Sequence, residues 1–368
     1  MRLEELELSN FRNYLSSRRR FSPGRNFLFG RNAQGKSNLL EAIALLALTK
    51  SFRGASDEEL VGFQGDRFAV SGTLVNERHQ PVTAAISYER HGRKQIAYHG
   101  KRLQRHADLV GKLPIVVFSP ESHRITSGPP AERRRFMDVL LSQGSPAYLA
   151  DLQEYSRVLR QRNAILGARR TPGADEELAA WDESLAESGA RIVNSRAAFF
   201  IEVANAIAGI YRRVDSAGGA LRLRYHGAVE PGDQARQALR DLLQHKRAVD
   251  WLRAQTTKGP HRDDVDIMIG DCSLRAYGSR GEHKSVLIAL KLMETEYLRQ
   301  RRDTAPMVIM DDLFSELDPQ RAVCCLELFS EQGQLFVSSV TAPSVQSQPD
   351  DLVLEIDNGN FGTAGEPS

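Results

Sequence analysis

The chain has 368 residues, of which 41% are hydrophobic and 26% are charged, so its composition is close to that of an average globular protein. Its 49 basic and 47 acidic side chains give a formal net charge of +2, which is too balanced to indicate a nucleic-acid-binding protein by itself. The sequence contains neither a metal-binding cysteine pattern nor an apolar run of about 18 residues, the length of a membrane span. The N-terminus carries acids where a secretion signal is basic, and we therefore expect a cytoplasmic protein.

The first hundred residues predict strands, a loop and a helix, followed by antiparallel strands. Residues 3–8 lie in a short extended stretch, and residues 26–29 form an apolar strand that ends in glycine. From Ser37 onward, apolar residues recur at the spacing of a helix. Between residues 67 and 100, apolar and polar positions alternate, as in antiparallel strands with one buried face.

The pattern changes at about Pro120, where alternation gives way to long helical repeats of apolar residues. Strand-like sequence returns at residues 265–269, and the apolar runs 307–310 and 335–337 are typical of buried parallel strands. The glycine-rich end of the chain, residues 358–368, is expected to fray. This organisation predicts an α/β unit that is interrupted by a helical insertion.

A phosphate-binding loop (Walker A motif) follows the apolar strand at residues 26–29. Its glycines allow backbone N–H groups to wrap around an anion, and the helix that follows adds a partial positive charge. We expect Lys36 to reach the β- and γ-phosphates of ATP, and the Ser37 hydroxyl to help bind Mg²⁺. The residues predicted to bind the nucleotide are Gly30, Arg31, Asn32, Ala33, Gln34, Gly35, Lys36 and Ser37.

The run 307–310 ends in two carboxylates, Asp311 and Asp312, as in a Walker B strand. This arrangement places acids at the carboxyl edge of a parallel sheet, where ligands bind. We expect Asp311 to hold Mg²⁺ through water and Asp312 to act as the general base or to position the attacking water. Lys36, Asp311 and Asp312 are therefore the predicted catalytic residues.

About 270 residues separate Walker A from Walker B, which is typical of ATP-binding-cassette (ABC) type ATPases with an inserted lobe. Residues 277–282 resemble the signature motif of that class, and Ser315–Asp318 resemble its D-loop. The resemblance implies that Ser279 and Gly281 close over the nucleotide bound to a second subunit, although Ser279 could equally be a plain helix N-cap.

We therefore expect an α/β, ABC-type P-loop ATPase head with an inserted, mostly helical lobe. The predicted division is an N-terminal half of the head at 1–118, the lobe at 119–254 and a C-terminal half of the head at 255–368.

Blocks along nearly the whole chain resemble the RecF family of bacterial recombination mediators. The matching residues are Leu8–Tyr14, Asn38–Ile43 after the phosphate loop, Lys50–Arg53, Phe118–Glu121, Gly128-Pro129, Arg133–Asp138, Leu159–Asn163, Gly259–Asp264 and Asp311–Asp318. RecF is similar to the heads of SMC-type ATPases without their coiled coil, and this sequence has no sustained heptads.

The resemblance implies an ATP-dependent homodimer with ATP and Mg²⁺ as cofactors. It also implies a weak, DNA-stimulated ATPase acting as a switch, which binds DNA at junctions or gaps between single and double strands. The implied partners are RecR and RecO, and functionally RecA and single-strand-binding protein, in DNA repair, replication restart and SOS induction. The alternative is the nucleotide-binding subunit of an ABC transporter, which shares the Walker and signature motifs but needs a membrane partner.

Two departures from the family pattern stand out. Glu282 and His283 follow the signature glycine where the family often has glutamine and another residue. No histidine follows the last strand, so residues 336–341 offer only hydroxyl groups as a γ-phosphate sensor. Asp312 is also shorter than the glutamate common in faster ABC ATPases, and we expect slow hydrolysis.

Other motifs keep two interpretations at this stage. Arg12 and Asn13 either touch the adenosine or do not, and the segment 261–264 is either a functional constellation or a structural turn. Several basic clusters are either DNA contacts or ordinary solvated surface. These clusters are Arg18–Arg20, Arg133–Arg135, Arg160 with Arg162, Arg212-Arg213 and Arg299 with Arg301-Arg302.

Overall fold

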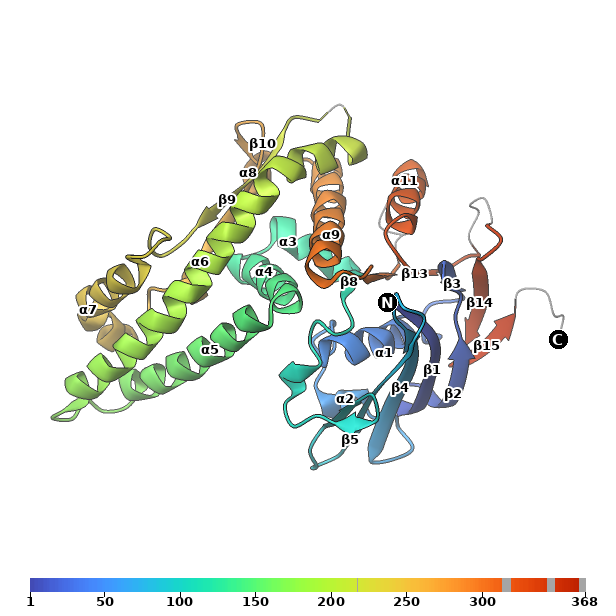
Figure 1. Cartoon of the computed structure of the whole chain (residues 1–368), viewed down its shortest axis with the longest axis horizontal. Helices are drawn as coiled ribbons and strands as arrows, with labels where there is room; N and C mark the ends of the chain where they lie inside the picture. The colour runs from blue at the N-terminus through green and yellow to red at the C-terminus, as the bar shows by residue number, and fades with distance from the viewer. Residues whose placement is uncertain (217, 313–318, 343–347, 364–368) are drawn as a thin grey trace. The chain divides into compact units, whose positions relative to one another are not determined.

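The computed structural model describes residues 1–216, 218–312, 319–342 and 348–363 (Figure 1). The chain divides into two units, each described here by itself. Unit 1 comprises Met1–Ser122 and Leu290–Ser368, and unit 2 comprises His123–Ala289. Residues 255–289, which the sequence-based division groups with the head, fall in unit 2, and the division runs through helix α9 (Arg280–Arg302).

Unit 1 contains a mostly parallel sheet with the strand order β15-β14-β3-β13-β12-β8. Only β15 runs antiparallel to its neighbour β14. The predicted parallel strands are confirmed, because Ile309 pairs with Phe336 on one side and with Val117 on the other. The strands span Arg25–Phe29 (β3), Ile115–Phe118 (β8), Met307–Met310 (β12), Leu335–Ser339 (β13), Leu352–Asp357 (β14) and Asn360–Thr363 (β15).

The second sheet of unit 1 is antiparallel, in the order β2-β1-β4-β5-β6-β7, as the alternation in the sequence predicts. Gln334 links this sheet to the first, because its buried side chain accepts from the Leu3 N–H and donates to the Leu3 carbonyl. The strands span Arg2–Phe11 (β1), Tyr14–Arg20 (β2), Arg67–Val75 (β4), Pro81–Glu89 (β5), Gln95–Tyr98 (β6) and Lys101–Arg102 (β7).

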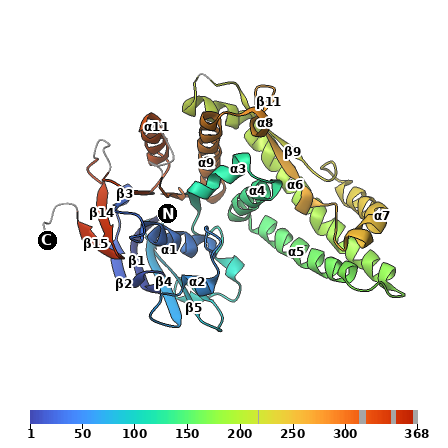
Figure 2. The same ribbon diagram turned by 180° about the vertical axis from the view of Figure 1, so that it is seen from behind.

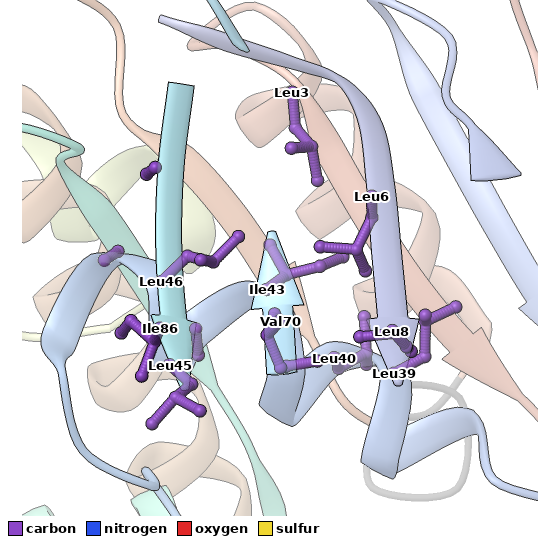
Figure 3. Close-up of a cluster of buried hydrophobic side chains, with 14 of the residues drawn as sticks. Leu3, Leu6, Leu8, Leu39, Leu40, Ile43, Leu45, Leu46, Val70 and Ile86 are labelled. Carbon is purple, nitrogen blue, oxygen red and sulfur yellow. The ribbon is translucent and has the colours of Figure 1, made fainter. Parts of the chain in front are cut away.

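Helix α1 (Lys36–Leu48) contacts strands of both sheets and is buried along nearly its whole length. Figure 3 shows Leu6 and Leu8 of β1 gathered with Leu40 and Ile43 of α1 in one apolar cluster. Each such side chain contributes about 1.5–3 kcal/mol when it is fully buried. The burial fixes the first residue of α1, Lys36, at the end of the phosphate loop.

Short elements complete unit 1. They are α2 (Asp57–Leu60), the 3₁₀ turns η1 (His106–Asp108) and η2 (Pro120–His123, which ends in unit 2), and helix α11 (Pro319–Ser330). None of the helices within the described residues is long and apolar enough to cross a membrane.

Unit 2 is mostly helical, as predicted, and its two longest helices, α5 and α6, run side by side in both views (Figures 1 and 2). A small sheet, β11-β10-β9, accompanies them. The elements are α3 (Arg124–Ser127), α4 (Pro130–Gly144), α5 (Pro146–Gly167), α6 (Ala174–Val214), β9 (Leu221–His226), α7 (Ala235–Arg253), η3 (Pro260–Arg262), β10 (Asp264–Ile269), β11 (Cys272–Ser273) and α8 (Leu274–Tyr277).

A buried ionic network joins three helices of unit 2. Arg162 on α5 has no exposed side-chain surface, and it donates to Asp182 of α6 at 2.6 Å and to Asp250 of α7 at 2.8 Å. It also donates to the Thr256 hydroxyl at 2.8 Å. A buried charge is tolerated only when it is paired and hydrogen-bonded, so Arg162 is a structural residue.

A second network shows that the segment 261–264 is built into the packing of unit 2. Arg196 of α6 donates to the Asp263 carboxylate, and Arg133 of α4 donates to both oxygens of Asp264. His261 lies between the Tyr155 hydroxyl and the Thr256 carbonyl. Because that carbonyl can only accept, the His261 Nε2 donates to it and Nδ1 accepts from Tyr155. These contacts favour the structural interpretation of the segment.

We predict that Arg162→Met destabilises unit 2 by about 3–5 kcal/mol, because it leaves the fully buried carboxylate of Asp250 without the Arg162 cation. Both tryptophans of the chain, Trp181 and Trp251, lie in unit 2, so urea unfolding followed by tryptophan fluorescence reports on this unit alone. Arg160→Met, two residues earlier on α5 at an exposed position, is the matched control and should change the unfolding midpoint little. Equal stability of the two variants would contradict the structural assignment.

The environment of His261 predicts a pH-dependent loss of stability. Burial, and then the charges of Arg262, Arg134 and Arg162, lower the pKa of His261 to about 4 from 6.5. The unfolded state therefore binds more protons between pH 6.5 and 4, and stability falls as pH decreases through that range, by at most about 3 kcal/mol.

The same fluorescence assay between pH 7 and pH 4 checks this expectation. His261→Gln should remove this part of the pH dependence, whereas replacing His245, an exposed histidine on α7, should leave it intact. An unchanged pH profile in His261→Gln would show that other groups are responsible.

Candidate nucleotide-binding site

The phosphate loop connects β3 to α1 and depends on two glycines for its shape. Gly30 and Gly35 adopt φ angles of 145° and 113°, which disfavour residues with a side chain. A Cβ atom at Gly30 would lie 2.4 Å from the Ile356 carbonyl oxygen, and one at Gly35 would lie 2.6 Å from the Asn13 side chain. The loop is therefore closely packed on both sides by its own protein.

Two hairpin turns supply that packing and meet at Gln34. The Asn13 side chain, between β1 and β2, donates to the Gln34 carbonyl at 3.1 Å. The turn between β14 and β15 contributes two backbone N–H groups: Gly359 donates to the same carbonyl at 2.9 Å, and Asn358 donates to the Gln34 side chain at 2.8 Å. The loop is thus held by segments from both ends of the sequence.

This contact corrects the expectation that the chain frays from residue 358. Residues 360–363 form β15, which pairs with β14, so the prediction is wrong for 358–363. Asn358 and Gly359 have φ angles of 49° and 78°, as a tight hairpin turn requires. The Asn-Gly pair after an apolar strand is the sequence signal that would have predicted this hairpin.

Lys36 folds back over its own loop. Its ammonium group donates to the carbonyl oxygens of Gly30 at 2.6 Å and Arg31 at 2.8 Å. Burial lowers the pKa of Lys36, and the negative charges of Asp312 and Asp311 oppose that effect. The lysine charge therefore lies within the electrostatic reach of both Walker B carboxylates, as the sequence predicts for one site.

The structure brings Ser37 and Asp311 together, although 274 positions separate them. The Ser37 hydroxyl donates to Asp311 Oδ1 at 2.8 Å, and the Ser338 hydroxyl donates to the same oxygen at 2.7 Å. Burial raises the pKa of Asp311, and the two hydroxyl donors partly offset this. A hydroxyl and a carboxylate are the hard oxygen ligands that Mg²⁺ prefers, so the donor set fits that ion.

Arg12 and Glu41 form a supporting layer that sequence reasoning missed. The Arg12 guanidinium makes two hydrogen bonds to Glu41, which is fully buried in α1, and a third to the Glu59 carbonyl. Ser51 also donates to Glu41. No local signal marks this pair, because Arg12 lies 29 positions before Glu41 in the sequence. Arg12 thus serves the packing of α1, while Asn13 contacts the loop itself.

The signature segment lies in unit 2, where Ser279 caps helix α9. The Glu282 N–H donates to the Ser279 hydroxyl at 3.2 Å, and the Ser279 N–H donates to the Glu282 carboxylate at 2.7 Å. This reciprocal pair is a capping box, so Glu282 has a structural role at the position where the family often has glutamine. Ser279 is exposed, and Gly281 lies in the first turn of the helix. The predicted D-loop, Ser315–Asp318, lies outside the described residues.

Several arginines of the basic clusters are neutralised or engaged by neighbouring residues. Arg18 pairs with Glu5 and Glu7, and Arg20 pairs with Glu5. Arg133 and Arg162 belong to the networks described above. The pair Arg212-Arg213, at the end of α6, is exposed, as are Arg299 and Arg301.

Comparisons with known proteins identify the family of the chain. The model of the "RecF/RecN/SMC N terminal domain" family matches residues 2–358. A DNA replication and repair protein RecF from Salinibacter ruber is 36% identical over 95% of this chain and 88% of that relative. The RecF of Heliobacterium modesticaldum is 38% identical, over 92% of each chain.

Solved structures give the same result. The recombination mediator protein RecF solved with ATP in the RecFOR pathway superposes with a TM-score of 0.91 at 31% identity, and the match covers 99% of this chain and 98% of that one. An Smc head superposes with a TM-score of 0.56 at 16% identity, which supports the fold alone. The predicted ABC-type, SMC-like α/β head with a helical lobe is confirmed, and the matches favour a RecF-type function over a transporter subunit. The chain belongs to the RecF family of DNA replication and repair proteins.

Proposed function

We propose that this chain binds ATP with Mg²⁺ at the phosphate loop and the Walker B carboxylates. The contact between Ser37 and Asp311 carries the proposal, because it joins two predicted metal ligands. Ser37 directly follows Lys36, the lysine that we expect to reach the phosphates. Gly30–Ser37 cradle the phosphates through backbone N–H groups and the N-terminus of α1. The relative solved with ATP supports the same ligand for this chain.

The nucleotide is then closed by a second copy of the chain. Ser279 and Gly281 supply a hydroxyl, a backbone N–H and a helix N-terminus, which are suited to the γ-phosphate of the partner subunit's nucleotide. The exposure of Ser279 supports this role, because its capping box leaves the hydroxyl accessible. ATP binding thereby assembles a homodimer.

Hydrolysis ends the dimeric state. Asp312 orients the attacking water while Lys36 and Asp311 hold the phosphates and the metal, which makes the chain a weak ATPase that DNA stimulates. The Asp312 side chain is shorter than the glutamate that faster ABC ATPases have at this position. We therefore expect a turnover number below about 10 per second, which is the median for enzymes. Such a rate suits a switch.

The DNA-bound dimer acts as a recombination mediator at gaps between single and double strands. We propose that it works with RecR and RecO to load RecA onto gaps covered by single-strand-binding protein, in repair, replication restart and the SOS response, in the cytoplasm. By function, we assign 1–118 and 255–368 to the ATPase head and 119–254 to its lobe, although the segment 255–289 belongs to unit 2 by its contacts. Family membership supports this assignment.

Sizing the protein with and without saturating ATP and Mg²⁺ tests the proposed mechanism. We predict an ATP-dependent dimer for the wild type, and monomers for Lys36→Met, which loses the phosphate contact. Ser279→Asp should also stay monomeric, because aspartate keeps the helix cap but places a negative charge against the γ-phosphate. A wild type that stays monomeric with saturating nucleotide would overturn the dimer mechanism.

Duplex DNA affinity should depend steeply on salt. Each phosphate contact contributes about 0.9 to the slope of log K against log salt, so replacing Arg212 and Arg213 with glutamine should reduce the slope by about 1.8. The matched control replaces Arg18 and Arg20, whose charges are paired with Glu5, and should leave the slope unchanged. Equal slopes in both double variants would place the DNA elsewhere.

A further inference from the structure

We infer that Ser338 is a positioning residue that holds both Walker B aspartates, and that its hydroxyl is committed to them and does not act as a γ-phosphate sensor. This inference rests on the proposed nucleotide site and deepens it. It concerns the end of β13, where the sequence offers hydroxyl groups in place of a histidine.

The strand order places Ser338 between the two halves of the site. Strand β13 lies between β3, which leads into the phosphate loop, and β12, which leads into Asp311. Ser338 pairs with Leu28 on β3 and lies one residue beyond Val337, which pairs with Met310 of β12. Its side chain is 1% exposed, so the hydroxyl must satisfy its hydrogen bonds inside the protein.

The Ser338 hydroxyl has a single proton, and it donates this proton in a hydrogen bond to a carboxylate. Ser338 donates to Asp311 Oδ1 at 2.7 Å, and its oxygen accepts the Asp312 N–H at 2.8 Å. An ionised carboxylate and a backbone N–H each have only one role in these bonds, so the direction of both is fixed. A phosphate oxygen is also only an acceptor, and Ser338 could bind it only by releasing Asp311.

The two bonds also fix the direction of the two acids. Asp312 has a φ of 55°, a left-handed conformation that costs a non-glycine residue about 1 kcal/mol or more. The bond from its N–H to Ser338 holds this turn, which points the buried Asp311 toward Ser37 and leaves Asp312 half-buried. Ser338 therefore orients Asp311 through a hydrogen bond, as outer partners commonly orient the residues that bind a metal ion.

Loss of the Ser338 hydroxyl should weaken the binding of Mg²⁺ more than the binding of the nucleotide. Without the hydroxyl, Asp311 loses one of the two hydroxyl donors that it has among the described residues and keeps Ser37, and the Asp312 N–H loses its bond to Ser338. Loss of such a partner typically weakens metal binding 10–100-fold, that is, by about one order of magnitude or more. The phosphate loop, which is held by Asn13 and the β14–β15 turn, keeps its contacts.

The test measures binding of the fluorescent nucleotide mant-ATP by Ser338→Ala, first without divalent ions and then during a titration with Mg²⁺. We expect the Mg²⁺ concentration for half-maximal effect to rise about tenfold, while the metal-free affinity stays within about twofold of the wild type. Ser338→Thr keeps the hydroxyl and should keep the Mg²⁺ response of the wild type. Ser338→Val, in which valine has the shape of threonine but no hydroxyl, should show the same defect as Ser338→Ala. This second pair decides the question if the alanine variant does not fold.

Ser339→Ala is the matched control, because this neighbouring hydroxyl is equally buried and donates to the Thr341 carbonyl. A Mg²⁺ defect as large in Ser339→Ala as in Ser338→Ala would overturn the inference. So would a γ-phosphate effect, in which Ser338→Ala weakens metal-free mant-ATP binding and leaves mant-ADP binding unchanged. An unchanged Mg²⁺ response in Ser338→Ala or Ser338→Val would also overturn it. Absence of nucleotide binding by the wild type would instead refute the proposed function.

Discussion

The candidate site depends on one constraint, which is that β13 separates β3 from β12 in the parallel sheet. This order places the phosphate loop and the Walker B carboxylates at the same edge, although unit 2 lies between them in sequence. The hydrogen bond from Ser37 to Asp311 is the direct result, and Ser338 on the intervening strand contacts the same carboxylate. A long insertion is tolerated because loop closure costs free energy only logarithmically with length.

A second constraint is that the arginines of this chain occur in two environments, buried in ion pairs or exposed at the surface. In unit 2, Arg162 and Arg196 are buried and hold helices and loops together through aspartates. At the end of α6, Arg212-Arg213 remains exposed, as a contact with the DNA backbone requires. The two kinds of arginine are indistinguishable as short basic clusters, and only burial separates them. An argument for DNA binding from such clusters therefore needs the fold first.

Features that depend on neighbouring residues could be predicted from the sequence. The apolar run before Asp311, the glycines of the phosphate loop and the alternation of the antiparallel strands each reflect a local physical requirement, and the structure contains these elements. Features that join distant segments could not be predicted in the same way. The layer formed by Arg12 and Glu41 and the bond from Ser338 to Asp311 depend on which strands become neighbours. The Asn358-Gly359 turn is the exception, because its Asn-Gly signal is local and predicts the hairpin without knowledge of the fold.

The signature segment shows how a departure from a family pattern can be consistent with the fold. The hydrogen bond from the Ser279 N–H holds the pKa of Glu282 below its ordinary value, so the carboxylate remains ionised at neutral pH. A glutamine would cap the helix as well but would carry no charge. In the proposed dimer, this negative charge would face the γ-phosphate of the partner's nucleotide and oppose closure, while the N-terminus of α9 favours it. The balance would keep the dimer weak enough to be released when the γ-phosphate leaves, which is the property a switch requires.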